Sequence, residues 1–187
     1  MSKMPGLRAA RTVLSHKGLL AVFGFVYVVS QVIIATIVDP LVAQRMVGLQ
    51  VSGFTATGYL ETFRAWDAEG TMPFYRAHLI FDDVHWIWYS IFLSVALALS
   101  LDGARLSDRW NIVLIFPLIA GINDWFENGL QHVFLSGTDY QTIIDPLPAI
   151  STSASIIKWI FFLGSFLLIG GMQLRRLTLG KIGQPNG

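Results

Sequence analysis

The stretch from Gly18 to Val38, GLLAVFGFVYVVSQVIIATIV, carries no formal charge along its whole length. A helix needs about 20 predominantly apolar residues to cross the hydrocarbon core of a bilayer, and this stretch is long enough. Lipid offers no hydrogen bonds to the backbone, so a lone segment crosses it as a helix. The sequence therefore predicts a spanning helix at 18–38, retained as an anchor because its apolar run exceeds the roughly 7–15 residues of a signal peptide.

Composition agrees with a membrane protein. Of the 187 residues, 53% are hydrophobic and only 13% are charged, whereas soluble domains have about 25% charged residues. The length suits a single domain over residues 1–187. The absence of cysteine excludes disulfides, thiolate nucleophiles and cysteine-ligated metal sites, and a net charge of +1 without a basic patch argues against nucleic-acid binding.

Three more apolar stretches follow, so the sequence predicts an all-α fold, a four-helix transmembrane bundle. Two connecting segments, DGARLSDRW and SGTDYQTIIDPLPAI, are rich in turn-forming residues. The predicted spans are 18–38, 78–101, 111–135 and 151–174.

The first outer loop, about residues 39–77, is long enough to hold structure of its own. Within it, the segment TGYLETFRAWDAEG places Tyr59, Leu60, Phe63 and Trp66 on one helical face. This pattern predicts a short amphipathic helix, either in the membrane interface or packed on the bundle. In both cases the helix would cover the outer end of the bundle.

Lysine and arginine residues outside the predicted spans are distributed unevenly. The N-terminal tail, the 102–110 loop and the C-terminal tail are rich in them, whereas the longer 39–77 loop has only Arg45, Arg64 and Arg76. Because positively charged flanks stay in the cytoplasm, we expect a multi-pass protein of the cytoplasmic (inner) membrane with both termini cytoplasmic.

Ionisable residues occur inside three of the predicted spans, although each Asp, Glu or Lys near the centre of a span costs about 2.5–3.5 kcal/mol on insertion. At about 1.5 Å per residue, all of them fall in the outer half of the bilayer. The helical period places His78, Asp82 and His85 on one stripe, while Asp83, about 100° from Asp82, is expected to face a neighbouring helix or the interface. We therefore predict a polar pocket that opens outward beneath the 39–77 loop.

Four carboxylates, three histidines and a lysine in these spans exceed what packing of a bundle needs. The leading hypothesis is an enzyme that acts on a lipid or isoprenoid-like substrate by acid–base chemistry, because one carboxylic acid can donate a proton while a neighbouring carboxylate accepts one. The candidate catalytic residues are Asp82, His85, Asp124, Glu127 and Lys158. The candidate substrate-binding residues are Gln31, Trp86, Tyr89, Trp125 and Asn128.

A second hypothesis is a divalent metal site, either alone or in support of acid–base chemistry. The spacing of His78, Asp82 and His85 suits ligands on one helical face, and carboxylates of the third span would complete a shell of nitrogen and oxygen donors that fits zinc, iron or manganese. The candidate ligands are His78, Asp82, His85, Asp124, Glu127 and His132.

A third hypothesis is a non-catalytic accessory subunit, whose polar groups meet a larger membrane complex or a second copy of the chain. Polarity in only one leaflet and the lack of a visible inverted repeat argue against an alternating-access transporter. The expected partners are therefore membrane lipid and a lipophilic small molecule, or other membrane proteins.

At YRAHLIFDDVHWIWY and DWFEN, the chain resembles uncharacterised bacterial four-span membrane proteins, which carry a tyrosine followed by an aspartate in the second span and a D-x-x-E-N motif in the third. The likeness covers most of residues 58–170 and implies the four-span fold without an activity. HLIFD also resembles the His-Leu-x-x-Glu of the emopamil-binding sterol isomerases, with Asp82 in the place of the glutamate, which implies acid–base chemistry of the isomerase type.

Overall fold

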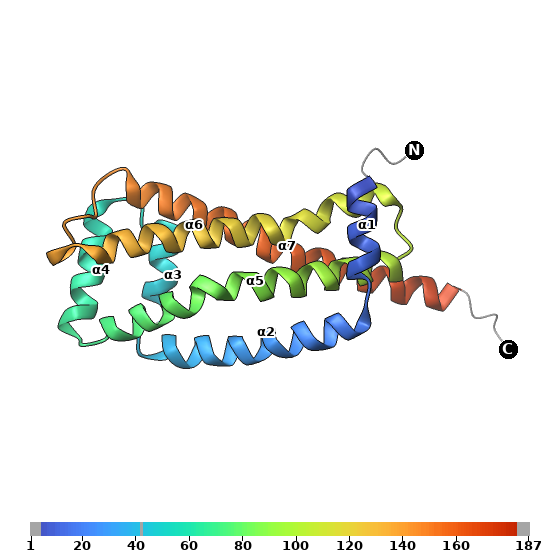
Figure 1. The fold of residues 1–187 in the computed structure, drawn as a ribbon, viewed down its shortest axis with the longest axis horizontal. Coiled ribbons are helices and arrows are strands. Elements are labelled where there is room, and N and C mark those ends of the chain that lie inside the picture. The colour runs from blue at the N-terminus through green and yellow to red at the C-terminus, as the bar shows by residue number, and fades with distance from the viewer. Residues whose placement is uncertain (1–4, 42, 183–187) are drawn as a thin grey trace.

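The structure is a computed structural model that describes residues 5–41 and 43–182 (Figure 1). Residue 42 of the predicted outer loop and both ends of the predicted 1–187 domain lie outside the described residues. The described part of the chain is helical and contains no strand, so the prediction of an all-helical fold is confirmed. Its elements are α1 (Pro5–Leu14), α2 (Lys17–Val38), η1 (Asp39–Leu41), α3 (Ala43–Ser52), α4 (Ala56–Ala68), α5 (Met72–Gly103), η2 (Asp108–Ile115), α6 (Phe116–Ser136), η3 (Thr138–Tyr140) and α7 (Leu147–Ile182).

The long helices α2, α5, α6 and α7 run along the long axis of the molecule and alternate in direction (Figure 1). Helices α5, α6 and α7 pack against one another, whereas α2 packs mainly along α5. Helices α3 and α4 lie across one end, and α1 lies across the other end, where α7 also finishes (Figure 1). The residues of the predicted pocket therefore lie between long helices, near the end covered by α3 and α4.

Three of the described helices are long and apolar enough to cross a membrane. They are Lys17–Leu41, Met72–Gly103 and Leu147–Thr178, with mean hydropathies of 2.3, 1.7 and 1.8. Helix α6 is not among them, since Asp124, Glu127 and amide side chains interrupt its apolar sequence. Buried carboxylates and apolar helices of spanning length agree with the prediction of a membrane protein.

Two helices begin at other residues than the predicted spans do, for local reasons. The predicted 111–135 span starts within η2, and α6 begins only at Phe116, because Pro117 occupies the first turn and suits a helix start. The 39–77 segment holds η1 and α3 before α4, and α5 already begins at Met72. Proline near the start of α5 again marks the helix start.

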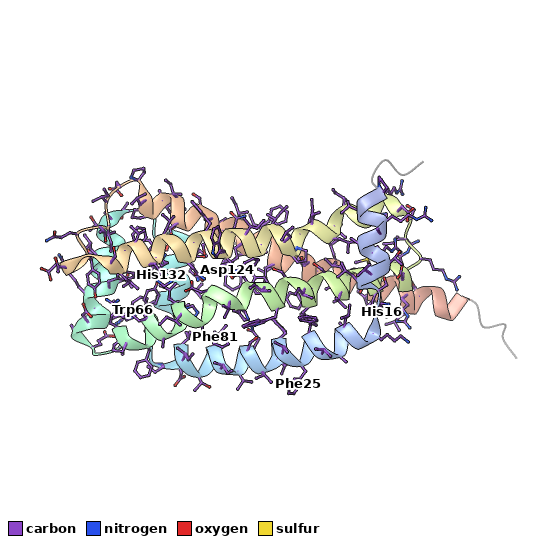
Figure 2. The ribbon with its side chains drawn as sticks, in the orientation of Figure 1. His16, Phe25, Trp66, Phe81, Asp124 and His132 are labelled. Carbon is purple, nitrogen blue, oxygen red and sulfur yellow. The ribbon has the colours of Figure 1, made fainter. Side chains whose placement is uncertain are left out.

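The aromatic side of helix α4 packs against the long helices. Thr55 caps its first turn, since the Thr55 hydroxyl accepts a hydrogen bond from the Gly58 amide at 3.2 Å. Tyr59, Phe63 and Trp66 are fully buried in a cluster that also includes Tyr75 of α5 and Phe134 of α6. Figure 2 shows Trp66 at this end of the molecule. Helices α3 and α4 thereby cover one end of the long helices.

The opposite end is held by Arg11 of α1. Its guanidinium contacts Asp102 at 2.7 Å and donates hydrogen bonds to the Leu106 carbonyl at 3.1 Å and the Asn111 side chain at 3.0 Å. Arg11 therefore links α1 to the end of α5 and to η2.

Candidate functional site

Lys158 of α7 lies between two carboxylates of α6. Its Nζ atom donates to Asp124 Oδ1 at 3.0 Å and forms an ion pair with Glu127 Oε2 at 2.6 Å. Asp124 and Glu127 are three residues apart, so they face the same side of α6. The second oxygen of Asp124 accepts a hydrogen bond from the Tyr89 hydroxyl at 3.0 Å. All four side chains are buried.

A second group, centred on His85 of α5, lies beside this ion pair. Gln31 Nε2 of α2 is 3.0 Å from His85 Nε2. With the amide nitrogen as donor, this ring nitrogen accepts, and the other ring nitrogen, Nδ1, lies 3.4 Å from Asp82 Oδ1. The other Asp82 oxygen accepts from Asn128 Nδ2 at 3.4 Å. Side chains from α2, α5 and α6 therefore hold Asp82 and His85 in place.

If all its carboxylates were ionised, this cluster would have more negative than positive charges. Asp82, Asp124 and Glu127 are buried together with one permanently charged cation, Lys158. Three ionised carboxylates would leave two uncompensated negative charges, which a medium of low dielectric strongly disfavours. The cluster therefore has to carry additional protons or bind a cation.

The cluster forms one wall of a cavity of about 300 Å³, which is at the small end for ligand pockets. Four residues of α5 and one each of α6 and α7 make this wall polar, and the other walls are mainly apolar. The lining residues are Tyr27, Gln31, Ile34 and Val38 of α2, Met46, Val47 and Gln50 of α3, His78, Asp82, His85 and Tyr89 of α5, Asp124 of α6, and Lys158, Trp159 and Phe162 of α7.

Most of the predicted site residues are brought together here. The cavity lining includes the predicted residues Gln31, His78, Asp82, His85, Tyr89, Asp124 and Lys158. Glu127 and Asn128 lie just behind it, beside a small adjoining space that His78 also borders.

Three predicted residues lie elsewhere. Trp125 is 59% exposed on the outside of α6, because it is rotated by about 100° from Asp124. Trp86 lies against Gly121 in the contact between α5 and α6. His132 is exposed and pairs with Asp83 at 2.8 Å on the outside of the same two helices, not at the cavity that Asp124 borders. Asp83 thus faces a different side from Asp82, as the helical period indicates.

Only part of the predicted ligand set is arranged for a metal. Donor atoms of Asp82, His85 and Asp124 all lie within 4.8 Å of one another, and this set suits zinc, iron or manganese. His78 borders the same cavity, and its buried Nδ1 has no hydrogen-bond partner among the described residues. Glu127 instead pairs with Lys158, and His132 lies outside the cavity.

A second polar network separates the cavity from α4. Gln131 of α6 donates to the hydroxyls of Tyr59 at 3.0 Å and Ser151 at 2.9 Å, and its oxygen accepts from Tyr75 at 2.7 Å. Burial raises the pKa of Tyr59 on α4, so the phenol stays protonated and neutral. The network joins α4 to three long helices without adding charge.

The apolar walls of the cavity have no distinctive signal in the sequence. Tyr27 and Ile34 carry no polar signal within a uniformly apolar span. Gln50 lies on α3, which was not predicted, and accepts a hydrogen bond from Trp159 at 3.2 Å. The spacing of Met46 and Leu49, both buried, is the signal that indicates α3.

Chemically, the arrangement can hold and exchange protons beside a small cavity with apolar walls, and it offers nitrogen and oxygen donors to a cation. The chain matches no family model, no curated protein and no solved structure.

Proposed function

We propose that the protein is an integral membrane enzyme that acts on a lipophilic, lipid- or isoprenoid-like substrate by acid–base chemistry. The observation that carries this proposal is the burial of Lys158 between Asp124 and Glu127 at a cavity that Asp82 and His85 also border. Helix association in a membrane needs only an occasional Asn or Gln. A charged cluster at a cavity wall is instead typical of a reaction site.

The membrane arrangement in this proposal is a four-helix transmembrane bundle of α2, α5, α6 and α7, with α4 as the predicted amphipathic loop helix. Helix α6 crosses as the fourth span because its carboxylates face α5 and α7, while Leu118, Ile122 and Trp125 are exposed on its other side. In this proposal α3 and α4 lie outside the cytoplasm and both termini lie inside, which the distribution of Lys and Arg supports.

The residues have separate roles in the proposed chemistry. Asp82 and Asp124 are the acid and base, since both border the cavity and both are held by donors. His85, positioned by Gln31, passes protons to and from Asp82. Lys158 compensates the charge of Asp124 and Glu127. The simplest reaction is a double-bond shift, in which one group protonates a carbon and the other removes a proton nearby, so no atom is gained or lost.

Deuterium incorporation tests this proposal without knowledge of the substrate. The purified protein, in nanodiscs containing total bacterial lipid extract, is incubated in ²H₂O, and lipids are analysed by mass spectrometry. We expect deuterium in at least one lipid species. Asp82→Asn and Asp124→Asn should slow incorporation by about 10²–10⁴-fold, the contribution of general acid–base catalysis.

Asp83→Asn is the matched control, because Asp83 is adjacent to Asp82 but pairs with His132 outside the cavity. It should keep the wild-type rate. Wild-type protein that labels no lipid and alters no lipid mass would overturn the proposal. Elemental analysis of the same samples decides whether a metal assists: about one divalent ion per chain in wild type, lost in Asp82→Asn, assigns the metal-assisted form.

A second candidate is the accessory subunit, and the Asp83–His132 pair favours it. This polar pair is exposed on the outside of α5 and α6, where a partner helix rather than lipid would suit it. The same two variants separate the candidates. An accessory subunit would lose a co-purifying membrane protein on Asp83→Asn and keep it on Asp82→Asn.

A further inference from the structure

We infer that the substrate enters the cavity sideways from the bilayer, between α2 and α7, and that its leading polar end carries no negative charge. This inference rests on the proposed function, because it concerns the substrate of the same cavity. It adds the direction of entry and the chemical class of the end group.

Helix α2 is held on one side only. It contacts α5 closely, where a Cβ atom on Gly24 would lie 3.5 Å from the Phe92 ring and Tyr27 stacks on Phe92 at 4.7 Å. It makes little contact with α7, and Ser30 is its only buried residue. Phe25 points away from the other helices and is 71% exposed (Figure 2). The side of α2 toward α7 is therefore the weakest part of the cavity wall.

The remaining boundaries leave a lateral opening. Helix α3 closes the outer end of the cavity with Met46 and Gln50. At the other end, the ring of Tyr27 lies 6.4 Å from that of Phe166 of α7. Between these closures, Ile34 of α2 and Phe162 of α7 line the cavity from opposite sides. Apolar residues on both sides of this gap suit a hydrocarbon chain that passes between them.

The volume limits how much of a lipid can enter. About 300 Å³ holds about ten groups of the size of a water molecule, at about 30 Å³ each. This space takes a polar end group and a few carbons. The rest of the chain then stays between α2 and α7 and in the bilayer, where it needs no protein cavity.

The charge of the cavity excludes an anionic end group. Among the described residues that line it, Lys158 is the only one with a permanent positive charge, and Asp124 and Glu127 already neutralise that charge. Asp82 adds a further carboxylate. A phosphate or carboxylate would therefore find no unpaired cation and would lie beside three acidic side chains, whereas a hydroxyl, carbonyl or amine finds partners in Gln31 and other polar side chains.

Three photoreactive probes test the end group. Each has the same dodecyl chain with a diazirine, and they end in a hydroxyl, an amine or a phosphate monoester. In nanodiscs, the alcohol or the amine should label peptides containing residues 27–38 and 158–162, and excess unlabelled alcohol should compete. The phosphate should label these peptides at least about tenfold less, the ratio for a difference of about 1.4 kcal/mol. Equal labelling by the phosphate, or none by the other two probes, would overturn the inference.

A reversible cross-link tests the direction of entry. The chain has no cysteine, so Ile34→Cys on α2 with Trp159→Cys on α7 gives one defined pair, both members of which line the cavity. Linking this pair with a reducible bismaleimide should block labelling, and reduction should restore it in the same sample. The control pair, Gly24→Cys with Phe92→Cys, links helices that already touch and should leave labelling unchanged.

If the probes label the cavity peptides equally well before and after complete cross-linking of the Ile34→Cys, Trp159→Cys variant, entry between α2 and α7 is excluded. These assays measure binding and not turnover. Deuterium incorporation that persists while the probes fail would therefore reject the inference and leave the proposed function intact.

Discussion

Lys158 shows how strongly single charges matter in this chain. It is buried with Asp124 and Glu127, and no other lysine or arginine contacts either carboxylate among the described residues. Removal of one partner of a buried ion pair is costly because it leaves an uncompensated charge, whereas removal of both charges costs much less. The effects of substitutions at Lys158, Asp124 and Glu127 on stability are therefore coupled, so the effect of one substitution depends on the charges that remain.

We expect Lys158→Met to lower the free energy of unfolding by about 3–5 kcal/mol, the cost of an unpaired buried charge. The double variant Lys158→Met with Glu127→Gln should recover part of this loss, because one of the two orphaned charges is removed. Denaturant unfolding in detergent micelles measures both. Lys17→Met, at an exposed position, is the control. Additive losses in the double variant would contradict the coupling.

Neighbouring residues of one helix lie inside and outside the cavity, and the helical period explains why. Asp82 lies in the cavity and Asp83 outside it, while Asp124 lies in the cavity and Trp125 outside it. A step of one residue rotates a side chain by about 100°. The residues that the period places with Asp82 were therefore predictable, whereas pocket roles for Trp86 and Trp125, inferred from residue type, were not supported by their positions.

At the scale of elements, the close contact of α5 and α6 depends on Gly121. A Cβ atom there would lie 2.5 Å from Ser90 Oγ and 2.9 Å from the Trp86 ring. Ser90 in turn donates to the Pro117 carbonyl at 2.9 Å. Because Asp124 follows Gly121 by one turn, this contact sets the position of Asp124 relative to Asp82 and Tyr89.

Gly121→Ala should destabilise the protein by about 1–3 kcal/mol, because the added methyl group forces α5 and α6 apart. Gly129→Ala is the matched control in the same helix, since nothing lies within 4 Å of its Cβ position. Alanine there should stabilise the helix by roughly 0.5–1 kcal/mol. Thermal unfolding of both variants gives the comparison, and a neutral Gly121→Ala would show that the contact is not tight.

Element boundaries were predictable where one strong signal dominates. The uncharged run that starts near Gly18 predicts α2 almost to the residue. The sequence does not predict helix α3, because the helix is short and Met46 and Leu49 give it only a weak pattern of buried apolar residues. Helix α6 begins at Phe116, inside the predicted 111–135 span, because hydropathy alone does not register the turn imposed by Pro117.

At the scale of the whole molecule, α1 and the end of α7 lie at one end, and α3 and α4 lie at the other (Figure 1). Basic residues are concentrated at the first end. Because Lys and Arg remain on the cytoplasmic side, this asymmetry predicts that the end with α1 and the end of α7 faces the cytoplasm.

Single cysteines test this orientation in intact cells, since the chain has none of its own. Ser107→Cys, exposed near the end with α1, should be protected from a membrane-impermeant maleimide until the cells are opened. Glu61→Cys, exposed on α4, should react in intact cells. The reverse pattern would place the cavity toward the cytoplasm.

The amino-acid sequence alone determined the helical class and the stretches that are long and apolar enough to span a membrane, because apolar runs and a period of 3.6 are local properties of the chain. It also indicated that Asp82, Asp124, Glu127 and Lys158 share one depth, because depth follows from counting residues. Only the tertiary structure decided which of them pair, that α2 contacts α5 but hardly α7, and that α3 closes the cavity. Those features depend on packing between segments distant in sequence, which no local pattern records.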